Sequence, residues 1–184
     1  MTDDELFARY RHSHEPALLD ELVRRNFDRV YRFVASMTGK RTCEQEVVDD
    51  LVQDVLLSVV RNIEKFRGDS ALATWIYRIA SNRVYRYFDE RKRLVPTIEA
   101  EQLEAVVDRQ RDTPESNELK QLIDNAIMDL SPALRAAMLL TTVEGFSPEE
   151  AAAIEGCTAA NIHWRVHKAR TMLKERLQKH FDND

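Results

Sequence analysis

The sequence predicts an all-α protein with two small helical domains joined by a flexible acidic linker. Three observations lead to this prediction. Apolar residues recur at three- and four-residue steps in two separate blocks of the chain. No stretch alternates apolar and polar residues strictly enough to indicate a strand. Charged residues make up 32% of the 184 residues while glycines number only 4, a composition typical of helix-rich surfaces.

The first predicted domain covers residues 1–94 and contains three apolar stripes of helical period. Breaks between these helices are predicted at residues 38–40 and 67–70, where glycine interrupts the pattern. The hydrophobic content of 43% is sufficient for compact cores. The stripes consist of Leu18, Leu22, Val30, Phe33, Val34 and Met37, of Val48, Leu51, Val52, Val55, Val59 and Ile63, and of Ile76, Ile79, Ala80, Val84 and Tyr87.

Residues 95–115 are predicted to form the linker, because periodicity is weak and prolines flank a run of acidic residues. The stretch 98–107 is also compatible with a short helix. Between residues 96 and 118 there are seven acidic and two basic residues, which accounts for the whole net charge of −5. The remaining charge is unevenly distributed, with basic stretches at residues 78–93 and 158–180. Local charge decides phosphate binding, so the acidic total does not exclude a DNA-binding protein.

The second predicted domain covers residues 116–184 and has clear helix boundaries. Ser131 is predicted to open a helix that ends at Gly145, and Ser147 to open a short helix, 148–155, that ends at Gly156. Thr158 then caps a longer amphipathic helix. The apolar stripe of that last helix consists of Ile162, Val166, Ala169, Leu173 and Leu177.

The order of a short helix, a tight turn and a longer helix is typical of a helix-turn-helix. In this arrangement the second helix enters the major groove by its N-terminal turns, where side chains reach base edges. Arginine and lysine suit phosphates or guanine, asparagine suits adenine, and an indole can touch a thymine methyl group. An ordinary helical hairpin with a solvated basic face is the alternative. The side chains that lie off the apolar stripe are Asn161, His163, Trp164, Arg165, His167 and Lys168.

Several classes of protein are not indicated by this sequence. We find no nucleophile–base pair, phosphate-binding glycine loop or metal-ligand cluster, so we expect neither an enzyme nor a bound cofactor. His163 and His167 are spaced to share a zinc ion but lack a further ligand on the same face. Cys43 and Cys157 are isolated thiols. No apolar run has the length of a membrane span, and the acidic N-terminus is unlike a signal peptide, so we expect a cytoplasmic protein without membrane insertion.

Two segments carry a family resemblance. Residues 66–82 join a Gly-Asp-Ser turn to a helix with aromatic side chains, arginines and an asparagine, which can hold a DNA strand and stack on unpaired bases. Residues 130–170 contain Leu-Ser-Pro, Val-Glu-Gly-Phe-Ser-Pro-Glu-Glu-Ala-Ala and Gly-Cys-Thr before a basic helix. In order and spacing, both segments resemble the bacterial RNA polymerase sigma factors of the extracytoplasmic-function (ECF) group. The resemblance covers about Leu22 to Arg93 and most of residues 129–177.

The resemblance implies three sets of functional residues. Asn82 and Phe66 would line a pocket for a base that leaves the stack. The minus-ten set consists of Ser58, Arg61, Asn62, Phe66, Trp75, Tyr77, Arg78, Asn82 and Arg86. The minus-thirty-five set consists of Thr158, Ala160, Asn161, His163, Trp164, Arg165, His167 and Lys168. The set that binds core RNA polymerase consists of Asp50, Leu51, Gln53 and Asp54.

Each set also has a purely structural interpretation. The acidic face at residues 50–54 is compatible with a solvated helix surface. Trp75 is compatible with a core or edge aromatic residue, and part of the aromatic and basic run at residues 83–88 must be core. The acidic linker either threads through the polymerase, as in relatives, or acts as a solubilising tether.

The sequence departs from the ECF pattern at five positions. Trp164 replaces a small polar residue, Ala160 replaces a glycine, and Glu155 stands where an aliphatic residue is common. Thr141 and Ser58 lack the positive charge found in many relatives. These differences affect the expected promoter sequence more than the expected mode of docking.

Taken as a family member, the chain is expected to bind core RNA polymerase and promoter DNA, to direct transcription initiation and to be controlled by an anti-sigma factor. No stable homo-oligomer is expected. Two alternatives stay open from sequence. One is a decoy that binds an anti-sigma factor without transcribing, and the other is a helix-turn-helix repressor that acts as a symmetric dimer on a palindrome.

Overall fold

The computed structural model describes residues 1–39, 45–94 and 114–181, and every regular element in these ranges is a helix. The predicted all-helical fold is therefore confirmed. Most of the predicted linker, the possible helix at 98–107 and Cys43 lie outside the described residues. The helix that follows begins at Pro114, two residues before the predicted start of the second domain at residue 116, and proline is favoured in a first helical turn. No helix of the described residues has the length and apolar character needed to cross a membrane.

The N-terminal region consists of α1 (Asp3–Ser13), α2 (Pro16–Thr38), α3 (Gln45–Asn62), a short 3-10 turn η1 (Ile63–Lys65) and α4 (Leu72–Leu94). The predicted apolar stripes of α2, α3 and α4 face a common core. The helix α1 was not among the predicted stripes. Its sequence signal is a capping box, in which the Thr2 hydroxyl accepts from the Glu5 amide and the Glu5 carboxylate accepts from the Thr2 amide.

The C-terminal region consists of α5 (Pro114–Met128), α6 (Pro132–Met138), η2 (Leu139–Val143), α7 (Pro148–Glu155) and α8 (Ala159–Phe181). Ser147 caps α7 through a capping box, and Gly156 ends the helix with a φ of 65° in the left-handed region. These observations confirm the predicted limits of the helix 148–155. The helix predicted to run to Gly145 instead changes at Leu139 into a wider π-helical segment, in which the Glu144 amide donates to the Leu139 carbonyl at 3.0 Å.

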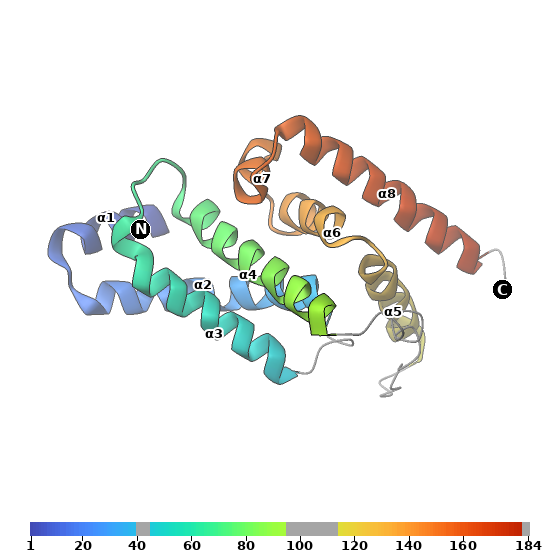
Figure 1. Cartoon of the computed structure of the whole chain (residues 1–184), viewed down its shortest axis with the longest axis horizontal. Helices are drawn as coiled ribbons and strands as arrows, with labels where there is room; N and C mark the ends of the chain where they lie inside the picture. Colours follow the sequence, from blue (N-terminus) through green and yellow to red (C-terminus); the bar gives the residue numbers. More distant parts are fainter. Residues whose placement is uncertain (40–44, 95–113, 182–184) are drawn as a thin grey trace.

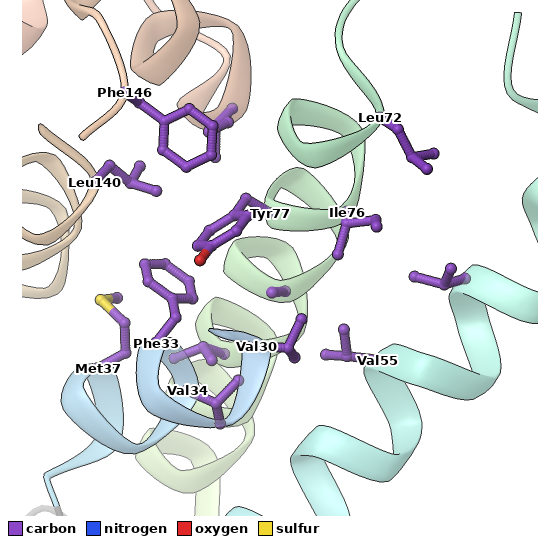
Figure 2. Packing of buried hydrophobic residues seen from close by; sticks show 14 of the residues in the cluster. Val30, Phe33, Val34, Met37, Val55, Leu72, Ile76, Tyr77, Leu140 and Phe146 are labelled. Atoms are coloured by element: carbon purple, nitrogen blue, oxygen red, sulfur yellow. The ribbon is translucent and has the colours of Figure 1, made fainter. Parts of the chain in front are cut away.

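The two helical regions pack against each other through an apolar contact. The α4 helix lies between α2 and α3 on one side and α7 on the other (Figure 1). The Tyr77 ring packs edge-on against Phe33 at 5.1 Å between ring centroids and against Phe146 at 4.9 Å. Met37 of α2 and Leu140 of η2 lie next to this contact, one from each region (Figure 2). Sequence patterns predicted two regions, but the continuity of their core follows only from the structure.

Arg135 connects the two regions by a second, polar contact. Its buried guanidinium donates to the carbonyls of Ile127 at 3.2 Å, Met128 at 2.6 Å and Leu130 at 3.0 Å, and also to the carbonyl of Met37 in the last turn of α2. A carbonyl in the last turn of a helix has no partner within that helix, so the guanidinium supplies one. Burial lowers the pKa of Arg135 to about 10, and the group therefore keeps its charge at neutral pH.

Candidate nucleic-acid and polymerase interfaces

The α8 helix exposes the face that the sequence predicts to read DNA. The Thr158 hydroxyl accepts from the Asn161 amide at 3.2 Å and caps the helix, as predicted. Ile162 and Ala169 are fully buried and hold the opposite face against the core. Trp164 is 61% exposed, an unusual position for an indole without a partner. The other exposed members of the minus-thirty-five set are Thr158, Ala160, Asn161, His163, His167 and Lys168.

Arg165 differs from the other members of that set. Its side chain is only 19% exposed, and its Nη1 lies 3.3 Å from the Oε2 of Glu155 on α7. The Glu155 side chain is itself 1% exposed. The structure thus places one predicted DNA-reading cation in an ion pair inside the protein.

The segment before α4 contains Phe66, one of the residues predicted to line a base pocket. Gly68 has a φ of 83°, a conformation that favours glycine. Phe66 is buried, with its ring 5.1 Å from Phe7 of α1 and 5.3 Å from Trp75. The Asp4 carboxylate of α1 accepts from the Leu72 amide at 2.8 Å, at the start of α4. Phe66 is therefore packed in the core between α1 and α4, and the half-buried Trp75 matches the edge-aromatic alternative.

The remaining predicted minus-ten residues fall into three groups. Arg61, Asn82 and Arg86 are exposed, so their side chains are accessible to a ligand. Ser58 and Asn62 are half-buried and joined, since the Asn62 amide donates to the Ser58 carbonyl at 2.9 Å.

The third group faces the C-terminal region. Tyr77 is buried, and its hydroxyl donates to the Glu144 carboxylate. The Arg78 Nε donates to the Ala153 carbonyl at 2.8 Å. Burial, with the neighbouring Glu144 carboxylate, raises the pKa of Tyr77 and keeps its hydroxyl a neutral donor.

The residues of α3 that were predicted to bind polymerase differ in their exposure to solvent. Asp50, Gln53 and Asp54 are exposed, whereas Leu51 is buried in the core. Asp54 also forms an ion pair with Arg83 of α4, with a shortest distance of 2.8 Å. The polar face is thus available for contact, and Leu51 contributes by packing α3 in place.

An apolar groove between α2 and α3 was not predicted. It has a volume of about 310 Å³, and its exposed apolar side chains include Phe27, Leu57 and Val60. Phe27 stacks on Tyr31 at 6.2 Å between ring centroids, which leaves both rings at the groove. Asp49 and Gln53 line the same groove. The available signal was Phe27 itself, an aromatic residue off the predicted α2 stripe.

Both halves of the chain match known families. Residues 22–94 match the family Sigma-70 region 2, and residues 127–174 match the sigma-like domain of the response regulator PhyR. The ECF RNA polymerase sigma-E factor of Escherichia coli K12 is 31% identical over 188 aligned residues, which cover 97% of this chain and 95% of that protein. The protein of the same name from Haemophilus influenzae is 36% identical over 141 residues, 71% of this chain and 75% of that protein.

The chain belongs to the ECF RNA polymerase sigma factors. It directs transcription initiation and is not an enzyme. The match to Sigma-70 region 2 and the likeness to sigma-E factors over 97% of the chain identify a sigma factor, so the repressor and decoy alternatives are set aside. The family is thus the one that the two sequence motifs indicated.

Solved structures of sigma factors share the fold of this one. The sigma factor RpoE of Bartonella quintana, in complex with the anti-sigma factor NepR, is 28% identical, with a TM-score of 0.68 and coverage of 86% of this sigma factor and 96% of that chain. CnrH, in complex with the cytosolic domain of CnrY, gives a TM-score of 0.70 at 21% identity and 96% and 97% coverage. At that lower identity the likeness concerns the fold alone.

Proposed function

We propose that this sigma factor reads the minus-thirty-five element with α8 and captures the melted minus-ten element with α4 and the segment before it. The observation that carries the proposal is the exposed face of α8. There an indole, an asparagine, two histidines and a lysine point away from a helix whose other side is anchored by Ile162 and Ala169. Solvent-facing polar and aromatic side chains at the N-terminal turns of such a helix are what base-edge contact requires.

The minus-ten contact is assigned to the exposed Asn82, Arg61 and Arg86, together with Phe66 at the segment before α4. An amide can read the Watson–Crick edge of an unpaired base, and a ring can cover its face. The cations suit the phosphates on either side. The packing of Phe66 between Phe7 and Trp75 supports this assignment because it holds the ring in a fixed position.

Core RNA polymerase is proposed to bind at α3 and the neighbouring groove. The exposed acids Asp50 and Asp54 suit a basic helical element, and Phe27, Leu57 and Val60 suit apolar side chains of the same element. The groove adds apolar packing to the ionic contacts of the acidic face, so the two together suit a polymerase element better than the acidic face alone.

An anti-sigma factor is proposed as a further partner. The support is the RpoE–NepR complex, whose sigma factor matches this chain over most of its length. No residue is assigned to that contact.

The test is transcription in vitro with purified core RNA polymerase over a fragmented bacterial genome. We expect discrete start sites that share an upstream element, and weaker transcription from those starts when Asn82→Ala or Trp164→Ala is introduced. Binding to polymerase without discrete starts would contradict the proposed promoter contacts. No binding to polymerase would contradict the assignment of α3 and its groove.

A further inference from the structure

Three side chains assigned to promoter reading are engaged between or within the two regions. Tyr77 bonds to Glu144, Arg78 bonds to the Ala153 carbonyl, and Arg165 pairs with Glu155. Tyr77 is buried and the Arg165 side chain is largely buried in this arrangement, whereas Arg78 is exposed but bonded to the other region.

Glu155 is the centre of this contact. Its Oε1 accepts from the Ser81 hydroxyl at 2.6 Å, and its Oε2 accepts from the Tyr85 hydroxyl at 2.5 Å. Ser81 and Tyr85 belong to α4, whereas Glu155 ends α7 and Arg165 belongs to α8. A single carboxylate thus joins α4 to both helices of the helix-turn-helix.

The burial of this carboxylate makes the contact selective for one arrangement. An almost fully buried charge is tolerated when hydrogen-bond donors and a counter-ion surround it, and is unfavourable when one of them is removed. Burial and the Glu155 charge also raise the pKa of Tyr85, so the phenol stays a donor throughout the physiological range. Glu155 has its complete set of partners only while α4 and α7 are in contact.

We infer that Glu155 is a latch between the two regions: through Ser81 and Tyr85 it holds the free chain closed, with Tyr77 and Arg165 withheld from DNA. This inference concerns the regulation of the proposed promoter surfaces and so rests on their assignment.

Opening of the latch changes both sides of the contact. On α4, separation of the two regions releases the exposed Arg78 from the Ala153 carbonyl and removes the Glu144 and Phe146 contacts that cover Tyr77. On α8, Glu155 becomes hydrated, and its ion pair with Arg165 becomes a surface pair, which contributes little to stability and competes weakly with a phosphate or a guanine. A partner that binds the opened chain, such as core polymerase, therefore favours the DNA-reading state by population shift.

The experiment measures the distance between the two regions in the full chain. Spin labels are attached at Asp28→Cys on α2 and Lys174→Cys on α8, both exposed positions, after replacement of Cys43 and Cys157 by serine. The double variant Ser81→Ala/Tyr85→Phe removes the α4 donors and leaves the C-terminal region untouched. Tyr87→Phe is the matched control, because it removes a phenol on the same helix whose oxygen accepts from Arg91 at 3.2 Å and does not contact Glu155.

We expect one narrow distance distribution for the parent and for Tyr87→Phe, and a broad distribution with longer distances for the double variant. Glu155→Leu should open the chain similarly, with helix content checked by circular dichroism. Affinity of the free chain for a labelled duplex carrying the upstream element should rise by about fivefold or more in the double variant.

The outcomes separate the latch from the proposed function. A broad distribution in the parent, or an unchanged narrow one in the double variant, overturns the latch. An opened double variant without a gain in DNA affinity supports the latch and contradicts the assignment of α8 to the upstream element. If Glu155→Leu does not fold, the double variant alone decides.

Discussion

The helices α4 and α8 are each 23 residues long and were both predicted to read promoter DNA, yet they differ in how much of their surface is buried. The α8 helix buries one stripe and leaves its predicted reading face in solvent, apart from Arg165. The α4 helix is packed against α2, α3 and α7, so that Tyr77 becomes part of the core and Arg78 contacts another helix. A reading face can be inferred from periodicity where one side of a helix is buried, and not where several sides are.

The largest effect that tests this difference is expected from Tyr77→Ala on α4. Removal of a buried aromatic ring leaves a cavity between Phe33 and Phe146, which should lower the free energy of unfolding by about 3–5 kcal/mol. Urea unfolding followed by circular dichroism measures this value. A loss of only about 0.5 kcal/mol, typical of surface positions, would mean that Tyr77 is not part of a core in solution.

A smaller effect, confined to function, is expected from Asn82→Ala on the same helix. The side chain is exposed, so stability should change by less than about 0.5 kcal/mol. Loss of contact with an unpaired base should weaken open-complex formation by about 1–3 kcal/mol. Permanganate footprinting measures melting, and polymerase affinity, which should stay constant, is the control. If the variant melts the promoter as well as the parent does, Asn82 does not contact the unpaired base.

On α8, the corresponding change is Trp164→Ala. An exposed indole contributes little to packing, so the free energy of unfolding of the variant should lie within about 0.5 kcal/mol of that of the parent. Affinity of the polymerase holoenzyme for the upstream element should fall by about 1 kcal/mol, or about fivefold. Lys174→Ala, at an exposed position farther along α8, serves as the control. Equal loss in both variants would indicate general electrostatic attraction instead of a base contact.

The smallest effect is expected from Arg83→Ala, which breaks the ion pair between α4 and α3. A partly exposed pair of this kind contributes about 0.2–1 kcal/mol to stability, and less at high salt. Denaturation midpoints at low and high salt measure it. A loss that does not diminish with added salt would show that Arg83 stabilises α4 by packing more than by charge.

Sequence reasoning located the local features of the fold well because their causes are local. The capping serine at 147, the left-handed glycine at 156 and the threonine cap at 158 all lie where they were predicted. The capping box at Thr2 was equally readable but was overlooked. The π-helical segment at 139–143 has no comparable sequence signal, since it depends on how Leu139 and Leu140 are accommodated in the core.

The candidate site was only partly predictable. Exposed members such as Asn82 and Trp164 were identified from motif and periodicity. The groove beside Phe27 was missed because it arises where α2 meets α3, and no single helix contains it. The departure at Glu155 was noticed, but its partners Ser81 and Tyr85 lie more than 70 positions away in sequence and in the other region.

By itself, the sequence determined the helices, their caps, the two-region organisation and the family. Each of these depends on residue type and short-range spacing, which a linear sequence contains. Only the tertiary structure decided that the two regions share a core around Tyr77, that Arg135 holds the end of α2, and that Glu155 unites α4 with α7 and α8. Such contacts depend on which distant faces meet when apolar surface is buried, and that is a property of the folded chain as a whole.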